Sequence, residues 1–392
     1  NVGQVAHDAR GNFVVAWASG AAGVYDVFAQ RFSAAGVRRG AEFRANAFTT
    51  GSQERPRVAS DAVGNFVVTW ESDLQDGSDF GAFAQRFGGL APAALAVDAP
   101  GNGVLQPGES VDVRPSWRNF NGAPQTVSAT VANMTGPAGA TYTILDGAGD
   151  YGTIADGATG PCSNCYAVSV SNPTVRPVLH WDASAVENIV PDTQGQQQEW
   201  LLHVGDSFTD VPPANAFYRF VETLLHRGVT GGCAGRLYCP GNATTREQMA
   251  VFVLVAKEGT GYAPPACVAG TEMFADVPAS SPFCPWIEEL ARRGVVSGCG
   301  GGNFCPTDPV TREQMGVFVL RTLDPLLAPP PCGTPVYPDV PASSPFCRWI
   351  EELTRRGVVT GCGGGNYCPS APVTREQMGV FLAVTYGLTL YG

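Results

Sequence analysis

The sequence predicts a multidomain β + α fold, in which a β-rich N-terminal half precedes an α-helical C-terminal half. The 392 residues are enough for two to four domains. A segment of strand-like character repeats near the start of the chain, and a longer motif recurs three times near its end. Ten of the twelve cysteines follow residue 206, so the two halves differ in how they are stabilised.

Composition excludes several classes of protein. The formal net charge is −11, and Lys257 is the single lysine beside 23 arginines. An acidic, lysine-poor surface argues against nucleic acid or an anionic membrane as the main partner. The hydrophobic fraction of 44% is enough to bury real cores, which excludes a disordered chain. No apolar run approaches the roughly 18–20 residues of a membrane span.

Residues 1–90 contain two related units. Residues 5–17 return as 58–70, and residues 29–32 return as 84–87. Each unit reads as a strand, a Gly-Asn turn, an apolar strand ending in Trp, a polar loop and a strand ending in Gln-Arg-Phe. These units resemble the blade-type β repeats of bacterial surface proteins, which predicts an incomplete, propeller-like arrangement.

Two such units are too few to bury a continuous core, because about three or more repeats are normally needed. The chain begins at Asn1 without an initiator Met or a signal segment, which predicts a processed or trimmed product. Two alternatives follow. Either further repeats precede these, or a neighbouring molecule supplies the missing β partner, which would produce polymers if the contact were head-to-tail.

Residues 91–205 predict an immunoglobulin-like β-sandwich, because seven short alternating segments are separated by Gly, Pro and Asn turns. The predicted strands cover residues 94–98, 110–117, 127–133, 141–145, 166–171, 178–183 and 199–204.

Residues 206–392 contain three units, at 206–262, 263–328 and 329–392. The third reads Tyr-Pro-Asp-Val-Pro, Trp-Ile-Glu-Glu-Leu, Arg-Gly-Val-Val-Thr-Gly-Cys, Tyr-Cys-Pro and Val-Thr-Arg-Glu-Gln-Met in chain order. The matching arginines are Arg246, Arg312 and Arg375, separated by 66 and 63 residues. This pattern resembles the S-layer homology (SLH) family, whose units read Phe-x-Asp-Val, Ile-x-x-Leu, Gly-Ile-Ile-x-Gly, Phe-x-Pro and Thr-Arg-Ala-Glu.

The resemblance implies an α-helical, pseudo-threefold bundle that binds cell-wall polysaccharide in grooves between its units. It also implies that Arg246, Arg312 and Arg375 contact an acidic sugar. The family has Ala-Glu after the arginine, whereas this chain has Glu-Gln in all three units. A structural reading stays open, because Thr-Arg-Glu-Gln is also a helix capping box. The predicted boxes pair Thr245 with Gln248, Thr311 with Gln314, and Thr374 with Gln377.

The cysteines divide into six local pairs, which predicts disulfides and an oxidising, extracellular compartment. The rival is a zinc site, which a lone C-x-x-C and four scattered histidines, His7, His180, His203 and His226, disfavour. The predicted pairs are Cys162/Cys165, Cys233/Cys239, Cys267/Cys284, Cys299/Cys305, Cys332/Cys347 and Cys362/Cys368.

Two further patterns have both a ligand reading and a turn reading. Asp98, Asn102 and Glu109 follow the spacing of a calcium loop, although a Gly-Asn turn leading into a strand is the rival. Asp8 and Asp61 precede Gly-Asn pairs, where they cap the turns or, less favourably, bind cations.

No motif for nucleophilic, metal-dependent or phosphate chemistry is present, so we expect no enzyme activity. The sequence predicts an extracellular structural protein of a bacterial cell surface, a subunit of a surface layer, fibre or sheath whose main partner is itself. One alternative is a monomeric adhesin or carbohydrate-binding protein held by the C-terminal units. Another is an accessory region of a secreted hydrolase.

Overall fold

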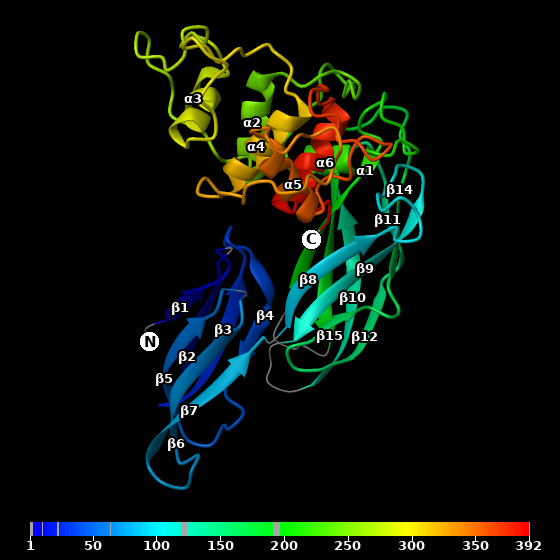
Figure 1. Cartoon of the computed structure of the whole chain (residues 1–392). Coiled ribbons are helices and arrows are strands. Elements are labelled where there is room, and N and C mark those ends of the chain that lie inside the picture. Colours follow the sequence, from blue (N-terminus) through cyan, green and yellow to red (C-terminus); the bar gives the residue numbers. More distant parts are fainter. Residues whose placement is uncertain are drawn as a thin grey trace. The chain divides into compact units, whose positions relative to one another are not determined.

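The computed structural model describes residues 3–9, 11–21, 23–62, 64–88, 90–119, 124–190 and 197–391. Arg10 and Val63, one from each N-terminal repeat, lie outside the described residues. The chain forms two compact units. The first comprises Asn1–Val175, Asp182–Leu202 and Tyr391–Gly392, and the second comprises Arg176–Trp181 and His203–Leu390. In Figure 1 the strands run from blue to green, and the helices from green to red.

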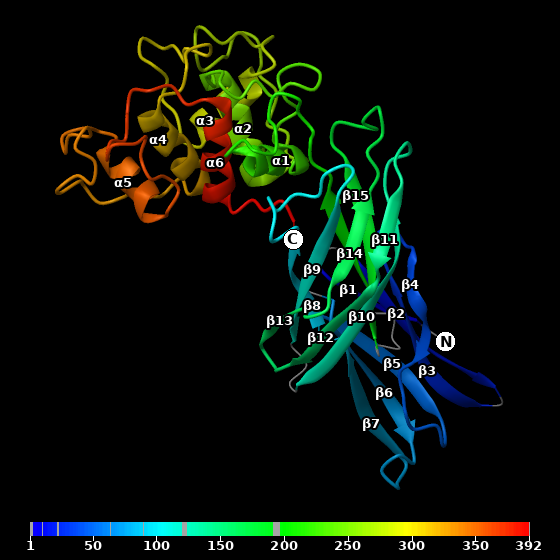
Figure 2. The same ribbon diagram turned by 90° about the vertical axis from the view of Figure 1, so that its right-hand side faces the viewer.

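The two N-terminal repeats fold as antiparallel meanders, with strand orders β1-β2-β3-β4 and β5-β6-β7 (Figure 2). The strands are β1 (Gln4–His7), β2 (Phe13–Ala21), β3 (Val24–Phe32), β4 (Arg38–Arg44), β5 (Gln53–Ser60), β6 (Phe66–Asp73) and β7 (Phe80–Phe87).

The turn between the first two strands of each repeat is capped by an aspartate. Asp8 accepts hydrogen bonds from the backbone and the side-chain amide of Asn12, at 2.9 and 2.8 Å. Asp61 accepts the same pair from Asn65, at 2.9 and 2.8 Å. The turn-capping interpretation of both aspartates is therefore confirmed.

The two meanders share one core. The first sheet contributes small and branched side chains and Phe43, and the second contributes mainly aromatic ones. The buried members are Val14, Ala16, Val27, Ala29, Phe43, Ala45, Phe66, Val68, Trp70 and Phe87. Arg31 adds a cation–π contact, with its guanidinium carbon 5.0 Å from the centre of the Phe66 ring.

A β-sandwich follows, as predicted. One antiparallel sheet has the order β12-β10-β15-β16; the other has the order β11-β14-β9-β13, with β8 also paired to β9. The strands are β8 (Leu90–Val97), β9 (Ser110–Asn119), β10 (Gln125–Thr135), β11 (Tyr142–Asp146), β12 (Ala148–Ile154), β13 (Thr159–Pro161), β14 (Tyr166–Val170), β15 (Asp182–Val190) and β16 (Gln197–His203). The sequence did not predict β12 and β13.

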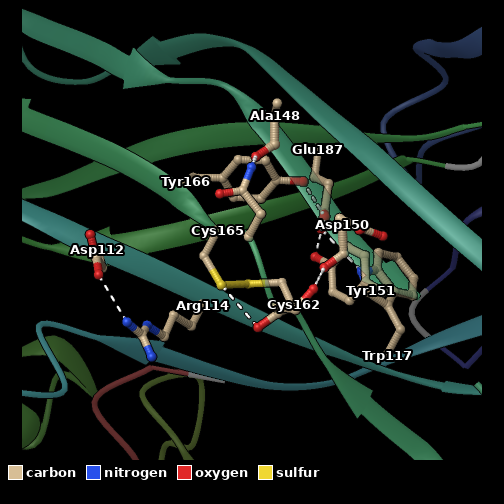
Figure 3. The surroundings of a disulfide bond; sticks show 12 residues. Asp112, Arg114, Trp117, Ala148, Asp150, Tyr151, Cys162, Cys165, Tyr166 and Glu187 are labelled. Carbon is tan, nitrogen blue, oxygen red and sulfur yellow. Dashed lines mark hydrogen bonds and ion pairs between the residues drawn. A yellow bond between two sulfur atoms is a disulfide. The ribbon is translucent and has the colours of Figure 1, made fainter. Parts of the chain in front are cut away.

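The predicted strand at 178–183 was wrong, because the structure begins β15 at Asp182. The reason is Glu187, a charged residue in the middle of β15 that is nevertheless fully buried. Its carboxylate accepts hydrogen bonds from four aromatic donors of both sheets, some of which Figure 3 shows. The donors are the indoles of Trp117 and Trp200 and the hydroxyls of Tyr151 and Tyr166.

These contacts keep the two phenols protonated. Burial, and secondly the charge of Glu187, raise the pKa of Tyr151 and of Tyr166 far above the ordinary value. Both hydroxyls therefore remain donors at every physiological pH. A buried carboxylate with this many donors holds the two sheets in a single arrangement.

The second unit contains six helices, two in each of the predicted C-terminal repeats. They are α1 (Tyr218–His226), α2 (Arg246–Glu258), α3 (Cys284–Arg292), α4 (Arg312–Leu323), α5 (Cys347–Arg355) and α6 (Arg375–Tyr386). Among the helices of the described residues, none combines the length and the hydropathy that crossing a membrane would require.

Candidate functional site

The longer helix of each C-terminal repeat begins at the repeated Thr-Arg-Glu-Gln segment. Thr245 and Thr311 cap α2 and α4, and both halves of the capping box are formed with Gln248 and Gln314. Thr374 also accepts the backbone N–H of Gln377 at the start of α6.

The third box is incomplete, which corrects the expectation of three equal boxes. The side-chain oxygen of Gln377 is buried and has no hydrogen-bond partner among the described residues. Helix initiation therefore explains the Thr and Gln positions fully in two repeats and only in part in the third.

An aspartate fixes the loop that precedes each long helix. The carboxylate of Asp339 accepts the backbone N–H groups of Tyr367 and Cys368, at 2.8 and 2.7 Å. Asp210 and Asp276 accept the corresponding pairs in the other two repeats. Each loop thereby presents a fully buried aromatic side chain: Tyr238, Phe304 or Tyr367.

The three predicted arginines join each repeat to the next. Arg246 donates its Nε–H to the carbonyl of Phe304 at 2.8 Å, and Arg312 donates to that of Tyr367 at 2.9 Å. Arg375 closes the cycle by donating to the carbonyl of Tyr238 at 2.8 Å. Each guanidinium also lies over the ring of the same aromatic residue, with distances of 4.6 to 4.9 Å to the ring centre.

Backbone hydrogen bonds form a second closed cycle just before the long helices. Thr244 donates to Val373, Val373 donates to Val310, and Val310 donates to Thr244, each at 2.9 Å. A cycle of three equivalent bonds is what threefold pseudosymmetry requires. The pseudo-threefold arrangement that the family resemblance implies is therefore present in the second unit.

Burial sets the electrostatics of these arginines. Their side chains are only 5–7% exposed. Desolvation lowers the pKa of Arg246 and of Arg375, while neighbouring aspartates and, for Arg375, Tyr238 act in the opposite direction. An arginine held in this way can stabilise the contact between repeats, and its role in binding a sugar stays a prediction.

All twelve cysteines are joined in the six pairs that their spacing predicts. Three of these disulfides close the Gly-rich loops, Cys233–Cys239, Cys299–Cys305 and Cys362–Cys368. Cys162–Cys165 lies in the sandwich (Figure 3). A short closed loop of this kind contributes about 2–3 kcal/mol by restricting the unfolded chain.

The proposed calcium residues form a tight turn. Asp98 accepts the backbone N–H of Asn102 at 2.9 Å, and Asn102 accepts that of Val104 at 2.9 Å. Glu109 lies after this turn, immediately before β9. The turn reading thus has direct support, and calcium binding by Asp98, Asn102 and Glu109 stays a prediction.

The expectation that the four histidines are scattered was wrong for three of them. His180, His203 and His226 gather in the second unit, with ring centres 5.3 to 5.8 Å apart. They come from the segment before β15, from β16 and from α1, so no spacing in the sequence indicates that they meet. His7 lies apart, in β1.

Comparison with known families identifies the C-terminal repeats. The S-layer homology domain family matches residues 207–250, 274–315 and 336–378. Residues 207–378 thus hold three S-layer homology domains. Such domains mark proteins of the bacterial cell surface, so this chain is a cell-surface protein.

Three curated relatives support this assignment. An "Endoglucanase" of Bacillus sp. (strain KSM-635) is 30% identical over 138 residues, which are 35% of this chain and 14% of the relative. A "Cell surface protein" of Thermoanaerobacter kivui is 27% identical over 121 residues, which are 30% of this chain and 16% of the relative. An "Amylopullulanase" of Thermoanaerobacterium thermosulfurigenes is 25% identical over 174 residues, which are 43% of this chain and 9% of the relative.

The chain therefore spans less than a fifth of the length of each of these relatives. The hydrolases match it only in the S-layer homology region. The similarity to the hydrolases therefore concerns the S-layer homology region.

Proposed function

We propose that this chain, a cell-surface protein with three S-layer homology domains, is a structural subunit of a surface layer, fibre or sheath. Its C-terminal domains attach to the envelope, and its N-terminal β repeats associate with those of neighbouring copies. The association between copies is supported by a difference between the two β repeats.

Equivalent positions of the two repeats differ in exposure. Val14 of the first repeat is 4% exposed, whereas Val67 of the second is 37% exposed. Ala29 is fully buried, whereas its equivalent Ala84 is exposed. The second sheet covers this face of the first sheet, and the same face of the second sheet is uncovered.

The opposite face behaves in the reverse way. Phe66 and Trp70 are buried against the first sheet, whereas their equivalents Phe13 and Trp17 are only half-buried. Phe13 stacks on Phe32 with ring centres 4.9 Å apart, so this half-buried face of the first sheet is aromatic. Each copy of the chain therefore has two faces that the other β repeat does not cover, one on the second sheet and one aromatic face on the first sheet.

A second copy of the chain offers the surface that is missing. The uncovered face of its second sheet matches the uncovered aromatic face of the first sheet in another copy. The contact repeats the one already made inside the chain, with Arg86 over Phe13 in place of Arg31 over Phe66. Because the two faces differ, this contact is head-to-tail and extends into a fibre.

A free strand edge supports the same proposal. In the first repeat β3 pairs with both β2 and β4, whereas within the described residues β7 pairs with β6 alone. The edge of β7 is therefore open to a strand from a neighbouring molecule.

Sedimentation and negative-stain microscopy of the purified chain test this proposal. We expect filaments or concentration-dependent oligomers that Ala84→Arg abolishes, because a long charged side chain blocks the packing face. Ala96→Arg, on an exposed position of β8, is the matched control and leaves assembly intact. Dispersed monomers at every concentration, or equal assembly of Ala84→Arg, would overturn the proposal.

The ligand that we propose for the S-layer homology domains is cell-wall polysaccharide, with Arg246, Arg312 and Arg375 as candidate contacts. Pulldown on purified cell walls tests this with Arg→Lys variants at these three positions, which keep the charge and lose the bidentate guanidinium. Unchanged binding by folded variants would remove the arginines from the site. Thermal unfolding separates a lost contact from a lost fold.

One observation favours a second candidate function. Several relatives are named as hydrolases and share only the anchoring region with this chain. The chain would then be the accessory region of a surface-held hydrolase. A gene that encodes a glycoside hydrolase domain in the same reading frame would support this candidate, and a gene without one would eliminate it.

A further inference from the structure

Three histidines meet where the chain enters the S-layer homology region. His180 lies in the segment Arg176–Trp181, His203 is the last residue of β16, and His226 is the last residue of α1. All three belong to the second compact unit. Their ring nitrogens lie within 4.8 Å of one another.

The arrangement of His203 is fixed by a carboxylate. The side chain of His203 is fully buried, and its Nε2 lies 2.8 Å from Oε2 of Glu222 on α1. Glu222 is held in turn by the backbone N–H and the hydroxyl of Ser207, at 3.0 and 2.7 Å. With Nε2 donating to Glu222, Nδ1 is the nitrogen of His203 that can act as a ligand.

A histidine that donates one ring N–H to a carboxylate is the usual form of a metal-binding histidine, because the carboxylate fixes the tautomer and strengthens the ligand. The segment that carries His180 is also held firmly. Arg176 donates to the carbonyls of Val204 and Gly205, both at 2.6 Å, and to the hydroxyl of Ser207 at 2.9 Å.

The donor set selects the class of metal. Imidazole nitrogen suits Zn²⁺, Cu²⁺ and Ni²⁺, whereas Ca²⁺ and Mg²⁺ prefer oxygen. Every cysteine of the chain is in a disulfide, so no thiolate competes for the ion. Zn²⁺ bound by three imidazoles needs nitrogens about 3.3 Å apart in tetrahedral geometry, so the three rings must close on the ion when it binds.

We propose that His180, His203 and His226 bind one Zn²⁺ ion, with Glu222 as the supporting carboxylate. The fourth ligand is water. The ion fastens the segment Arg176–Trp181 and His203 to the end of α1. It is a structural metal at the start of the first S-layer homology domain, and it is independent of the proposed assembly.

Equilibrium dialysis of the full chain, produced without a histidine tag and treated first with a chelator, tests this proposal with Zn²⁺ alone. We expect one Zn²⁺ per chain, with Ca²⁺ unable to displace it. His180→Ala and His226→Ala should weaken binding by more than about tenfold, and Glu222→Gln by about tenfold. His7→Ala is the matched control and should bind as the unaltered chain does.

A second measurement guards against variants that fail to fold. His180 is exposed, so its replacement should leave the thermal midpoint of the metal-free chain unchanged. Zn²⁺ should raise the midpoint of the unaltered chain and of His7→Ala, and should not raise that of His180→Ala. Absence of bound Zn²⁺ in the unaltered chain, or equal binding by His180→Ala, would overturn the proposal.

Discussion

Both compact units are built from repeats, but one set of repeats is closed and the other is open. Three helical repeats complete one another, because the arginine of each repeat donates to the next and Arg375 donates back to the first. Two β repeats cover one face each and leave the other face uncovered. A set of repeats is closed when every repeat makes the same contact with the next one and the last repeat makes that contact with the first.

This difference between the helical and the β repeats indicates which surface of the chain needs a partner molecule. In the closed set the three arginines have the same kind of environment, so they are nearly equal in exposure. In the open set the same residue type is buried in one repeat and exposed in the next. Such a mismatch between equivalent positions locates an unfilled interface more sharply than exposure of a single apolar side chain does, because isolated exposed apolar residues are normal.

The largest expected effect comes from one substitution at two equivalent positions. Val14→Asp places a charge in the shared core and should lower the free energy of unfolding of the β repeats by about 4 kcal/mol. Val67→Asp should change it by less than about 0.5 kcal/mol, because the side chain is already exposed. Urea denaturation measures both.

Val67→Asp should affect assembly although it hardly affects the stability of the subunit. Val67→Asp should prevent filament formation while the subunit stays folded. If Val67→Asp destabilised the isolated subunit as much as Val14→Asp does, the second face would be covered within the subunit, and the contrast between the two repeats would fail.

A smaller effect is expected at the closed junctions. Arg375→Ala leaves the buried carbonyl of Tyr238 without its donor and removes the cation–π contact, which should cost about 3 kcal/mol. Arg246→Ala and Arg312→Ala should cost about the same, because each guanidinium makes the same hydrogen bond and cation–π contact at its junction. Arg219→Ala, an exposed position on α1, is the control and should have little effect.

Unequal losses at the three arginines would break the closed-repeat description. If only Arg246→Ala lowered the stability, the cause would be the aromatic partner of Arg246. Tyr238 and Tyr367 donate their hydroxyls to the backbone carbonyls of Arg375 and Arg312, whereas Phe304 has no hydroxyl. Thermal unfolding of the three variants side by side makes the comparison.

The smallest effect concerns pH and Asp339. Burial raises the pKa of this carboxyl, but hydrogen bonds from the backbone of Tyr367 and Cys368 outweigh burial and lower the pKa below its ordinary value. A lowered pKa means that the charged form stabilises the fold above the unfolded pKa of about 3.9 and that this stabilisation is lost as the pH falls through the folded value.

Asp339→Asn removes the charge that produces this dependence. The variant should unfold at a lower temperature than the unaltered chain at pH 7, and the difference should shrink as the pH falls from 5 to 3. A difference that stays constant over this range would show that the carboxylate contributes through its shape alone.

The repeated features could be predicted from the sequence because the same residues recur at equivalent positions in several units. The Thr-Arg pairs and the cysteine pairs of the Gly-rich loops occupy equivalent places in successive units, so their environments follow from one another. The meander of each β repeat followed from its alternation and its Gly-Asn turn.

Features that occur once could not be predicted in this way. Glu187 reads as a surface residue, and only the convergence of four aromatic donors from both sheets makes its burial favourable. Strands β12 and β13 contain glycines or span few residues, so their alternation is weak. The three histidines lie at least 23 residues apart in successive pairs and meet only through the tertiary fold.

The closed cycle of the helical repeats also sets an order in time. Thr244 and Tyr238, in the first repeat, obtain their partners from Val373 and Arg375, which lie in the third repeat. A chain that stops before α6 leaves a buried N–H and a buried carbonyl unsatisfied in its first repeat and stays open to proteases. The first repeat is therefore complete only when the third repeat has folded against it.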